Sequence, residues 1–195
     1  GAAVGCYMHP VLAVPGQAPE PVGLSLAEEA DTALLQGIRQ WLLAKACEAV
    51  ADESTGADAE KRFVGVALRG NLSCVNGIVD DITAAIAHAD IEPSQLWLIL
   101  QEDELPPANS DSWTALQTCR RSGVRLVISE FGARLAPMAV PLRGEVDAVA
   151  LAHGLIARPH GYSALADDIS RLARDPNLYL LAMGADCERT QSIAR

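Results

Sequence analysis

The sequence predicts an α/β fold in which a parallel sheet is covered by helices. Short apolar runs alternate with longer amphipathic runs along the chain, at a spacing of roughly 20 to 40 residues. Half of the 195 residues are apolar and 21% are charged, a composition typical of globular proteins. Gly-rich phosphate motifs of the GxGxxG or Walker type are absent from the sequence. The alternation therefore indicates a barrel or an open doubly wound sheet, and a Rossmann nucleotide domain is unsupported.

The apolar runs predict six strands, each bounded by turn-forming or polar residues. The run Leu96–Leu100 is nearly continuous, as expected for a strand buried on both faces. The six predicted strands are Cys6–Val14, Phe63–Leu68, Leu96–Leu100, Val124–Ile128, Val146–Leu151 and Leu178–Met183.

Helices are predicted where apolar residues recur at the 3.6-residue period. Ser25 with Glu28 forms a capping-box pattern at the first helix, and Asn109 or Ser110 can cap the third. The predicted helices are Ser25–Val50, Val75–Ala89, Ser110–Ser122, Tyr162–Arg174 and a last one beginning near Cys187. The connecting segments Pro15–Pro21 and Ala51–Lys61 are predicted loops, and Leu135–Leu142, with two prolines, is at best a short helix.

Charge and cysteine usage restrict the class of partner and the compartment. There are 15 Lys and Arg against 25 Asp and Glu, a formal charge of −10, which argues against nucleic acid or an anionic membrane surface as the main partner. Apolar runs stay below the roughly 20 residues that span a membrane. The five cysteines form no CxxC pair, so we expect buried, reduced thiols and a cytoplasmic location. The start lacks Met and signal-peptide features, and we expect a fragment of a larger multidomain chain.

Several motifs, in order along the chain, resemble the EAL domain, the cyclic di-GMP phosphodiesterase family of bacterial signalling. The matches run from about residue 5 to 195 and so cover nearly the whole chain. In the following list, the family's version of each motif stands in parentheses where one is given. The motifs are YMHPV at Tyr7–Val11 (YQPIV), LAEEA at Leu26–Ala30 (LAEETG), WLLAKAC at Trp41–Cys47 (WVLREAC), IEPSQL at Ile91–Leu96, GVRLVISEFG at Gly123–Gly132 (GVRLALDDFG), the strand Val146–Ala152 (VDYLKID) and LAMGAD at Leu181–Asp186 (VAEGVE). The resemblance implies one domain, residues 1–195, with the EAL-type modified TIM (β/α) barrel. A TIM barrel takes about 250 residues, so we expect an incomplete one.

The departures from the family pattern concern catalysis. The resemblance implies two metal ions at the carboxyl rim of the barrel, held by carboxylates and an Asn. Apolar side chains cannot ligate Mg²⁺, so we expect no metal, no cofactor and no enzymatic activity. The replaced positions are Ala67 for the Asn, Ile99 for a Glu, Ser129-Glu130 for the Asp pair, Ala150-Leu151-Ala152 for Lys-Ile-Asp, Met183 and Asp186 for two Glu, and Pro21–Leu24 for the Glu-Ala-Leu signature.

Polar and aromatic residues at predicted strand ends are candidates for a vestigial cleft or a nucleotide-binding site. They are His9, Pro10, Glu102, Glu130, Phe131, Asp147 and Asp186. Plainer interpretations stay open beside this one. His9 can be a structural histidine with satisfied hydrogen bonds, and Glu102 begins an acidic run that can be a solvated loop.

These observations favour a catalytically inactive EAL-like domain that acts through a protein partner in cyclic di-GMP signalling, in regulation of motility, pili or biofilm. The resemblance also implies a homodimer as one option. The first alternative is a receptor that binds cyclic di-GMP without hydrolysing it. Against it, the family's phosphate-binding arginine has no counterpart, because Leu24 runs directly into Ser25. The second alternative is a residual phosphodiesterase.

Overall fold

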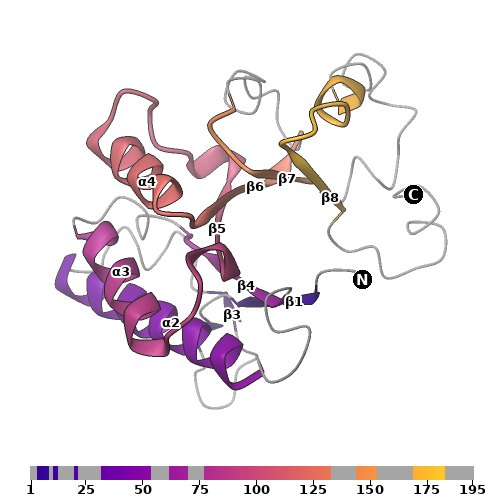
Figure 1. The fold of residues 1–195 in the computed structure, drawn as a ribbon. Helices are drawn as coiled ribbons and strands as arrows, with labels where there is room; N and C mark the ends of the chain where they lie inside the picture. The colour runs from indigo at the N-terminus through magenta and orange to yellow at the C-terminus, as the bar shows by residue number, and fades with distance from the viewer. Residues whose placement is uncertain are drawn as a thin grey trace. The chain divides into compact units, whose positions relative to one another are not determined.

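The structure is a computed structural model of the 195-residue chain. It describes residues 4–8, 11–12, 20–21, 32–53, 62–69, 77–132, 144–152 and 169–182 (Figure 1). The contacts divide the chain into two compact units. The first comprises residues 1–100 and 106–125, and the second comprises residues 101–105 and 126–195.

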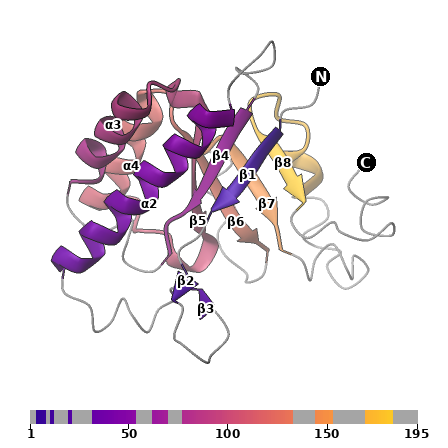
Figure 2. The ribbon, with the colours of Figure 1, turned by 90° about the horizontal axis from the view of Figure 1, so that it is seen from below.

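The first unit is built on three parallel strands, β1 (Val4–Met8), β4 (Arg62–Ala67) and β5 (Leu96–Gln101). Strand β4 lies between the other two and pairs with both, and Figure 2 shows the arrows of β1 and β4 side by side. Consecutive parallel strands need long crossovers, which here contain helices. The second and third predicted strands are thus confirmed, each within one residue.

The first predicted strand, Cys6–Val14, is wrong as a single element. Strand β1 ends at Met8, and β2 (Val11–Leu12) pairs antiparallel with β3 (Glu20–Pro21) in a separate sheet. The two parts of the predicted strand therefore pair with different partners, β1 with β4 and β2 with β3. An apolar run in the sequence does not indicate which strand each half of the run pairs with.

Three helices accompany these strands in the first unit, α2 (Thr32–Glu53), α3 (Ile78–Ala89) and α4 (Asp111–Arg121). Helix α2 packs on α3 and on β4, and α3 packs on α4; Figures 1 and 2 show the three helices gathered together. The Ser110 hydroxyl accepts a hydrogen bond from the Trp113 backbone N–H at 3.1 Å, so the predicted N-cap is confirmed. The predicted starts at Ser25 and Val75 lie outside the described residues.

Backbone conformation and close packing explain why residue 123 is a glycine. Gly123, just after α4, has φ +105°, and a Cβ at this position would lie 3.2 Å from Cβ of Pro93. A side chain there would meet both a strained backbone and a neighbour, so this turn requires glycine. The turn brings the chain out of α4 toward the next strand.

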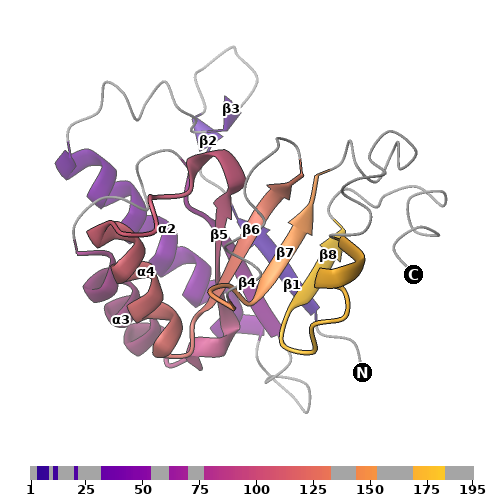
Figure 3. The same ribbon diagram turned by 90° about the horizontal axis from the view of Figure 1, so that it is seen from above.

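The second unit is built on β6 (Arg125–Phe131), β7 (Ala148–Leu151) and β8 (Tyr179–Ala182), which are parallel with β7 between the others (Figure 3). All three strands were predicted, although β6 runs three residues farther than expected. Residues 169–172 are helical, in agreement with part of the predicted helix Tyr162–Arg174. The segment Leu135–Leu142 and the helix near Cys187 lie outside the described residues.

Burial agrees with the expected role of the described cysteines and disagrees with part of the helix pattern. Cys47 and Cys119 are buried free thiols. Burial raises the pKa of each to about 11, so both stay protonated and unreactive at neutral pH.

Leu34 and Trp41, predicted on the apolar face of α2, are 52% and 58% exposed. No helix among the described residues has the length and hydropathy of a membrane span.

Candidate functional site

Ligand sites of parallel α/β proteins lie at the carboxyl ends of the strands. In the second unit, this edge is formed by the segment after β5 and by the ends of β6 and β7. Glu102 is only 8% exposed there, and its Oε2 accepts a hydrogen bond from the Gly132 backbone N–H at 3.2 Å. The predicted site residue Glu102 is therefore not a solvated loop residue. Its carboxylate holds the turn that follows β6.

The end of β6 carries backbone strain at a predicted site residue. Glu130 has φ +57°, a conformation uncommon for residues other than glycine, and the β6–β7 register shifts between Ile128 and Phe131. Ser129 and Phe131 on either side are buried, whereas Glu130 is half-buried. Strained residues persist where surrounding structure holds them, and they concentrate at binding sites. Glu102, Glu130 and Phe131 thus lie at one edge of the second unit.

Asp147 does not join this group. It precedes β7, so it lies at the opposite, amino end of the strands, where its Oδ2 accepts from the Leu126 backbone N–H at 2.9 Å. Its backbone N–H donates to the Leu126 carbonyl, and its carbonyl accepts from the Tyr179 N–H, each at 2.9 Å. The inclusion of Asp147 in a cleft is corrected by this placement, because a buried carboxylate committed to strand backbones is structural. His9, Pro10 and Asp186 lie outside the described residues.

Four of the positions at which this chain departs from the family's catalytic pattern are buried and apolar. Their exposed fractions are 1% for Ala67, 8% for Ile99, 1% for Ala150 and 4% for Ala152. Mg²⁺ needs several hard oxygen ligands, and none of these side chains has an oxygen. Within the described part of the chain, no three His, Cys, Asp or Glu side chains gather closely enough to hold a metal. These four side chains therefore cannot hold a metal ion.

Two arginines of the first unit were missed by the sequence interpretation. Arg39 is fully buried in α2 and pairs with Asp81 of α3. Arg69 follows β4, two residues beyond Ala67, and its Nε is buried. A cation so close to an emptied ligand position was the available signal for Arg69. Nothing in the apolar pattern of α2 distinguished Arg39 from an exposed arginine.

Comparison with known structures finds the same fold in EAL proteins. "PaMucR Phosphodiesterase, c-di-GMP complex" is 26% identical, with a TM-score of 0.69 over 87% of this chain and 74% of that one. "Structure of EAL Enzyme Bd1971 - cAMP and cyclic-di-GMP bound form" is 14% identical, with a TM-score of 0.80 over 97% of this chain. This chain spans 53% of that one.

A bacterial domain extends this comparison. The EAL domain of Mycobacterium smegmatis DcpA is 18% identical, with a TM-score of 0.66 over 79% of this chain and 70% of that one. At these identities, the Bd1971 and DcpA comparisons support the fold alone. A search of curated proteins found no match.

The fold class predicted from the sequence, an α/β domain of the EAL type, is confirmed by these structures and by the parallel strands with intervening helices. The sequence model of the EAL domain matches residues 6–195, nearly the whole chain. On that match, this chain belongs to the EAL domain family.

Proposed function

We propose that this EAL domain takes part in cyclic di-GMP signalling without hydrolysing the dinucleotide, and that it acts through contacts with a protein partner. One observation carries the proposal, namely the apolar side chains at four positions where the family has an Asn, a Glu, a Lys and an Asp. Ala67, Ile99, Ala150 and Ala152 are buried and offer no oxygen to a metal. The strands that carry them keep their parallel pairing, so the scaffold persists where the ligands are gone.

The chemical consequence concerns the attacking water. Two bound metal ions generate hydroxide at neutral pH and neutralise the charge that develops on the phosphate. Glu102 accepts from the Gly132 N–H, and Glu130 is the only acidic residue left at the position of the Asp pair. These two carboxylates are negatively charged and cannot supply the positive charge of two metal ions. Loss of hydrolysis is therefore the expected result of the substitutions.

A hydrolysis assay tests this part of the proposal. The purified chain is incubated with cyclic di-GMP and either Mg²⁺ or Mn²⁺, with a phosphodiesterase such as PaMucR as positive control. We expect no linear dinucleotide above the buffer background. The variant A67N/I99E, which restores two oxygen donors, is a matched test of whether ligand chemistry limits activity. Metal-dependent hydrolysis by the unmodified chain contradicts the proposal.

The protein-partner part needs a separate experiment, because loss of catalysis does not identify what the domain contacts. The tagged chain is used to capture proteins from a bacterial lysate with and without added cyclic di-GMP. A defined partner is then confirmed with both components purified. Absence of a reproducible partner under either condition contradicts a scaffold that works through protein contacts.

A non-hydrolysing cyclic di-GMP receptor is the second candidate. The structures of PaMucR and of Klebsiella pneumoniae BlrP1 are described as cyclic di-GMP complexes, the latter 16% identical to this chain. In this chain, Arg69 offers a cation near an emptied ligand position, which favours an anionic ligand. Isothermal titration with cyclic di-GMP, with and without Mg²⁺, separates the candidates. Micromolar or tighter binding favours the receptor.

A further inference from the structure

The side chain of Arg69 lies at the carboxyl end of β4. The β4–β5 pairing includes Ala67 opposite Ile99, and the ladder continues one residue farther because the Leu68 N–H donates to the Ile99 carbonyl at 2.9 Å. Arg69 is the next residue. It therefore stands at the edge where ligands of parallel α/β proteins bind.

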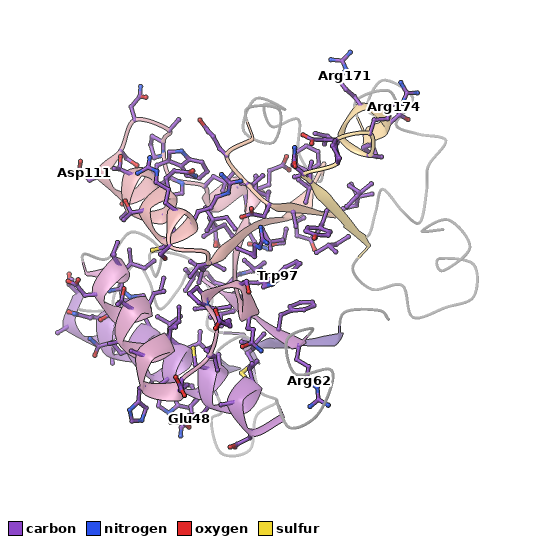
Figure 4. All side chains as sticks on the ribbon, viewed as in Figure 1. Glu48, Arg62, Trp97, Asp111, Arg171 and Arg174 are labelled. Carbon is purple, nitrogen blue, oxygen red and sulfur yellow. The ribbon has the colours of Figure 1, made fainter. Side chains whose placement is uncertain are left out.

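The alternation of strand residues places Arg69 on a defined face. Successive residues of a strand point to opposite faces, so Phe63 and Ala67 share one face and Leu68 belongs to the other. The ring of Phe63 stacks on Trp97 of β5 with centroids 4.2 Å apart, which fixes that face on both strands (Figure 4 labels Trp97). We infer from the same alternation that Arg69, which lies just beyond the strand and two residues past Ala67, belongs to this face.

One donor of the Arg69 guanidinium lacks a hydrogen-bond partner among the residues that the structure describes. That donor is Nε, which is buried. Buried donors are nearly always paired, and an unpaired donor on a charged group is costly. The same unit shows how the chain satisfies an arginine, since Arg39 donates from Nε to Asp81 Oδ2 at 2.8 Å. The buried Nε of Arg69 is thus a donor whose hydrogen bond a bound anion can complete.

We propose that Arg69 binds an anionic oxygen of a phosphate group, so that the carboxyl end of β4 forms a phosphodiester contact. A guanidinium is always charged and donates in a planar fork that matches phosphate oxygens. The expected ligand class, a phosphodiester rather than another anion, rests on the function proposed above. In this arrangement, a fixed organic cation supplies positive charge on the face where the family has its Asn.

Binding measurements on matched variants test the contact. Calorimetric titrations use cyclic di-GMP and, separately, inorganic phosphate, with the unmodified chain, R69Q, R69K and R62Q. Arg62 is the matched control because it projects from the opposite, amino end of the same strand (Figure 4). We expect R69Q to weaken cyclic di-GMP binding roughly ten- to a hundredfold, as for loss of charged hydrogen bonds, while R62Q stays within about twofold, as expected for a screened surface charge.

Other results also decide the matter. If only inorganic phosphate binds and R69Q abolishes that binding, the contact stands with a free phosphate as its ligand. If the unmodified chain binds neither probe, or R69Q binds as tightly as the unmodified chain, the proposal is wrong. If R69Q lowers the melting temperature, the affinity of R69K is the deciding measurement. Lysine keeps the positive charge of Arg69 but lacks the planar guanidinium that donates two parallel hydrogen bonds. Weaker binding by a stably folded R69K supports the contact, and unchanged affinity overturns it.

This outcome is separable from that of the proposed function. Hydrolysis of cyclic di-GMP would contradict the proposed function and leave an Arg69–phosphate contact intact. Absence of binding to either probe would overturn the contact, and a non-hydrolysing domain that works through a protein partner would be unaffected.

Discussion

Two arginines of the first unit differ in whether a buried donor has a partner. Arg39 has no exposed surface, and it pairs with Asp81, which also accepts from Gln40 Nε2 at 2.8 Å. Arg69 has a buried Nε without a partner in the described part of the chain. The first arginine is neutralised within the fold and joins two helices. The second leaves a donor unsatisfied, which costs stability unless a ligand supplies the acceptor. The comparison separates a structural cation from a cation available for binding.

The largest expected effect comes from breaking the satisfied pair. Asp81→Ala leaves the Arg39 charge buried and unpaired, and we expect the free energy of unfolding to fall by about 3–5 kcal/mol. Urea denaturation measures this loss. Lys45→Gln is the control, because Lys45 and Glu48 form an exposed pair on the same α2 helix, and such pairs contribute about 0–1 kcal/mol. Equal losses in the two variants would contradict a structural role for Arg39.

A smaller effect is expected where an unsatisfied donor is created on purpose. Glu102→Ala removes the acceptor of the buried Gly132 N–H, and we expect a loss of about 1–3 kcal/mol. Glu102→Gln keeps an amide oxygen at the same place, so its loss should stay below about 1 kcal/mol. Thermal and urea denaturation of both variants measure the difference. Indistinguishable losses would show that the hydrogen bond to Gly132 contributes nothing.

The buried thiols provide a pH test within the same unit. Burial raises the folded-state pKa of Cys47 and of Cys119 from 9.0 to about 11; the Arg39 charge acts in the lowering direction on Cys119. The folded chain therefore binds more protons than the unfolded chain between pH 9 and 11. Stability is complete below pH 9 and decreases through this range, by on the order of 1–2 kcal/mol per thiol.

Urea denaturation between pH 8 and 10.5 measures this decrease, and Cys47→Ala/Cys119→Ala should flatten it. A slope that persists unchanged in the double variant would assign the pH dependence to other groups.

The smallest change in stability, and one of opposite sign, is expected at the unsatisfied arginine. Arg69→Leu removes an unpaired donor, so the unliganded chain should gain about 0.5–1 kcal/mol or stay unchanged. The measurement is the same urea denaturation without ligand, with Arg62→Leu as the control on the same strand. A loss above about 1 kcal/mol would mean that Arg69 is satisfied within the fold, and the comparison with Arg39 would fail.

Periodicity and turn chemistry predicted most of the described fold. The strands β4 and β5 and the Ser110 cap of α4 follow from local residue patterns. The interruption after Met8 was missed because an apolar run does not state its pairing partner. The exposure of Leu34 and Trp41 was missed because a helical period assigns a face without stating how much of that face neighbouring elements cover.

The candidate site stays a prediction. Strand-end motifs proposed Glu102, Glu130 and Phe131 as site residues, and all three lie at one edge of the second unit. Asp147 was placed with them because its motif is continuous with the family's strand. The structure shows it at the amino end instead, and only the strand direction distinguishes the two ends. Arg69 was overlooked although it stands two residues past Ala67, and whether its donors are paired does not follow from the sequence.

By itself, the sequence determined the alternation of strands and helices and the oxygen-free chemistry at Ala67 and Ile99, because side-chain composition and period are local properties. Tertiary structure alone decided the burial of Arg39 against Asp81, the left-handed backbone of Glu130 and the unsatisfied Nε of Arg69. These depend on which groups the fold brings within hydrogen-bonding distance. The satisfaction of a buried charge is a property of its surroundings in space, and residues far apart along the chain supply them.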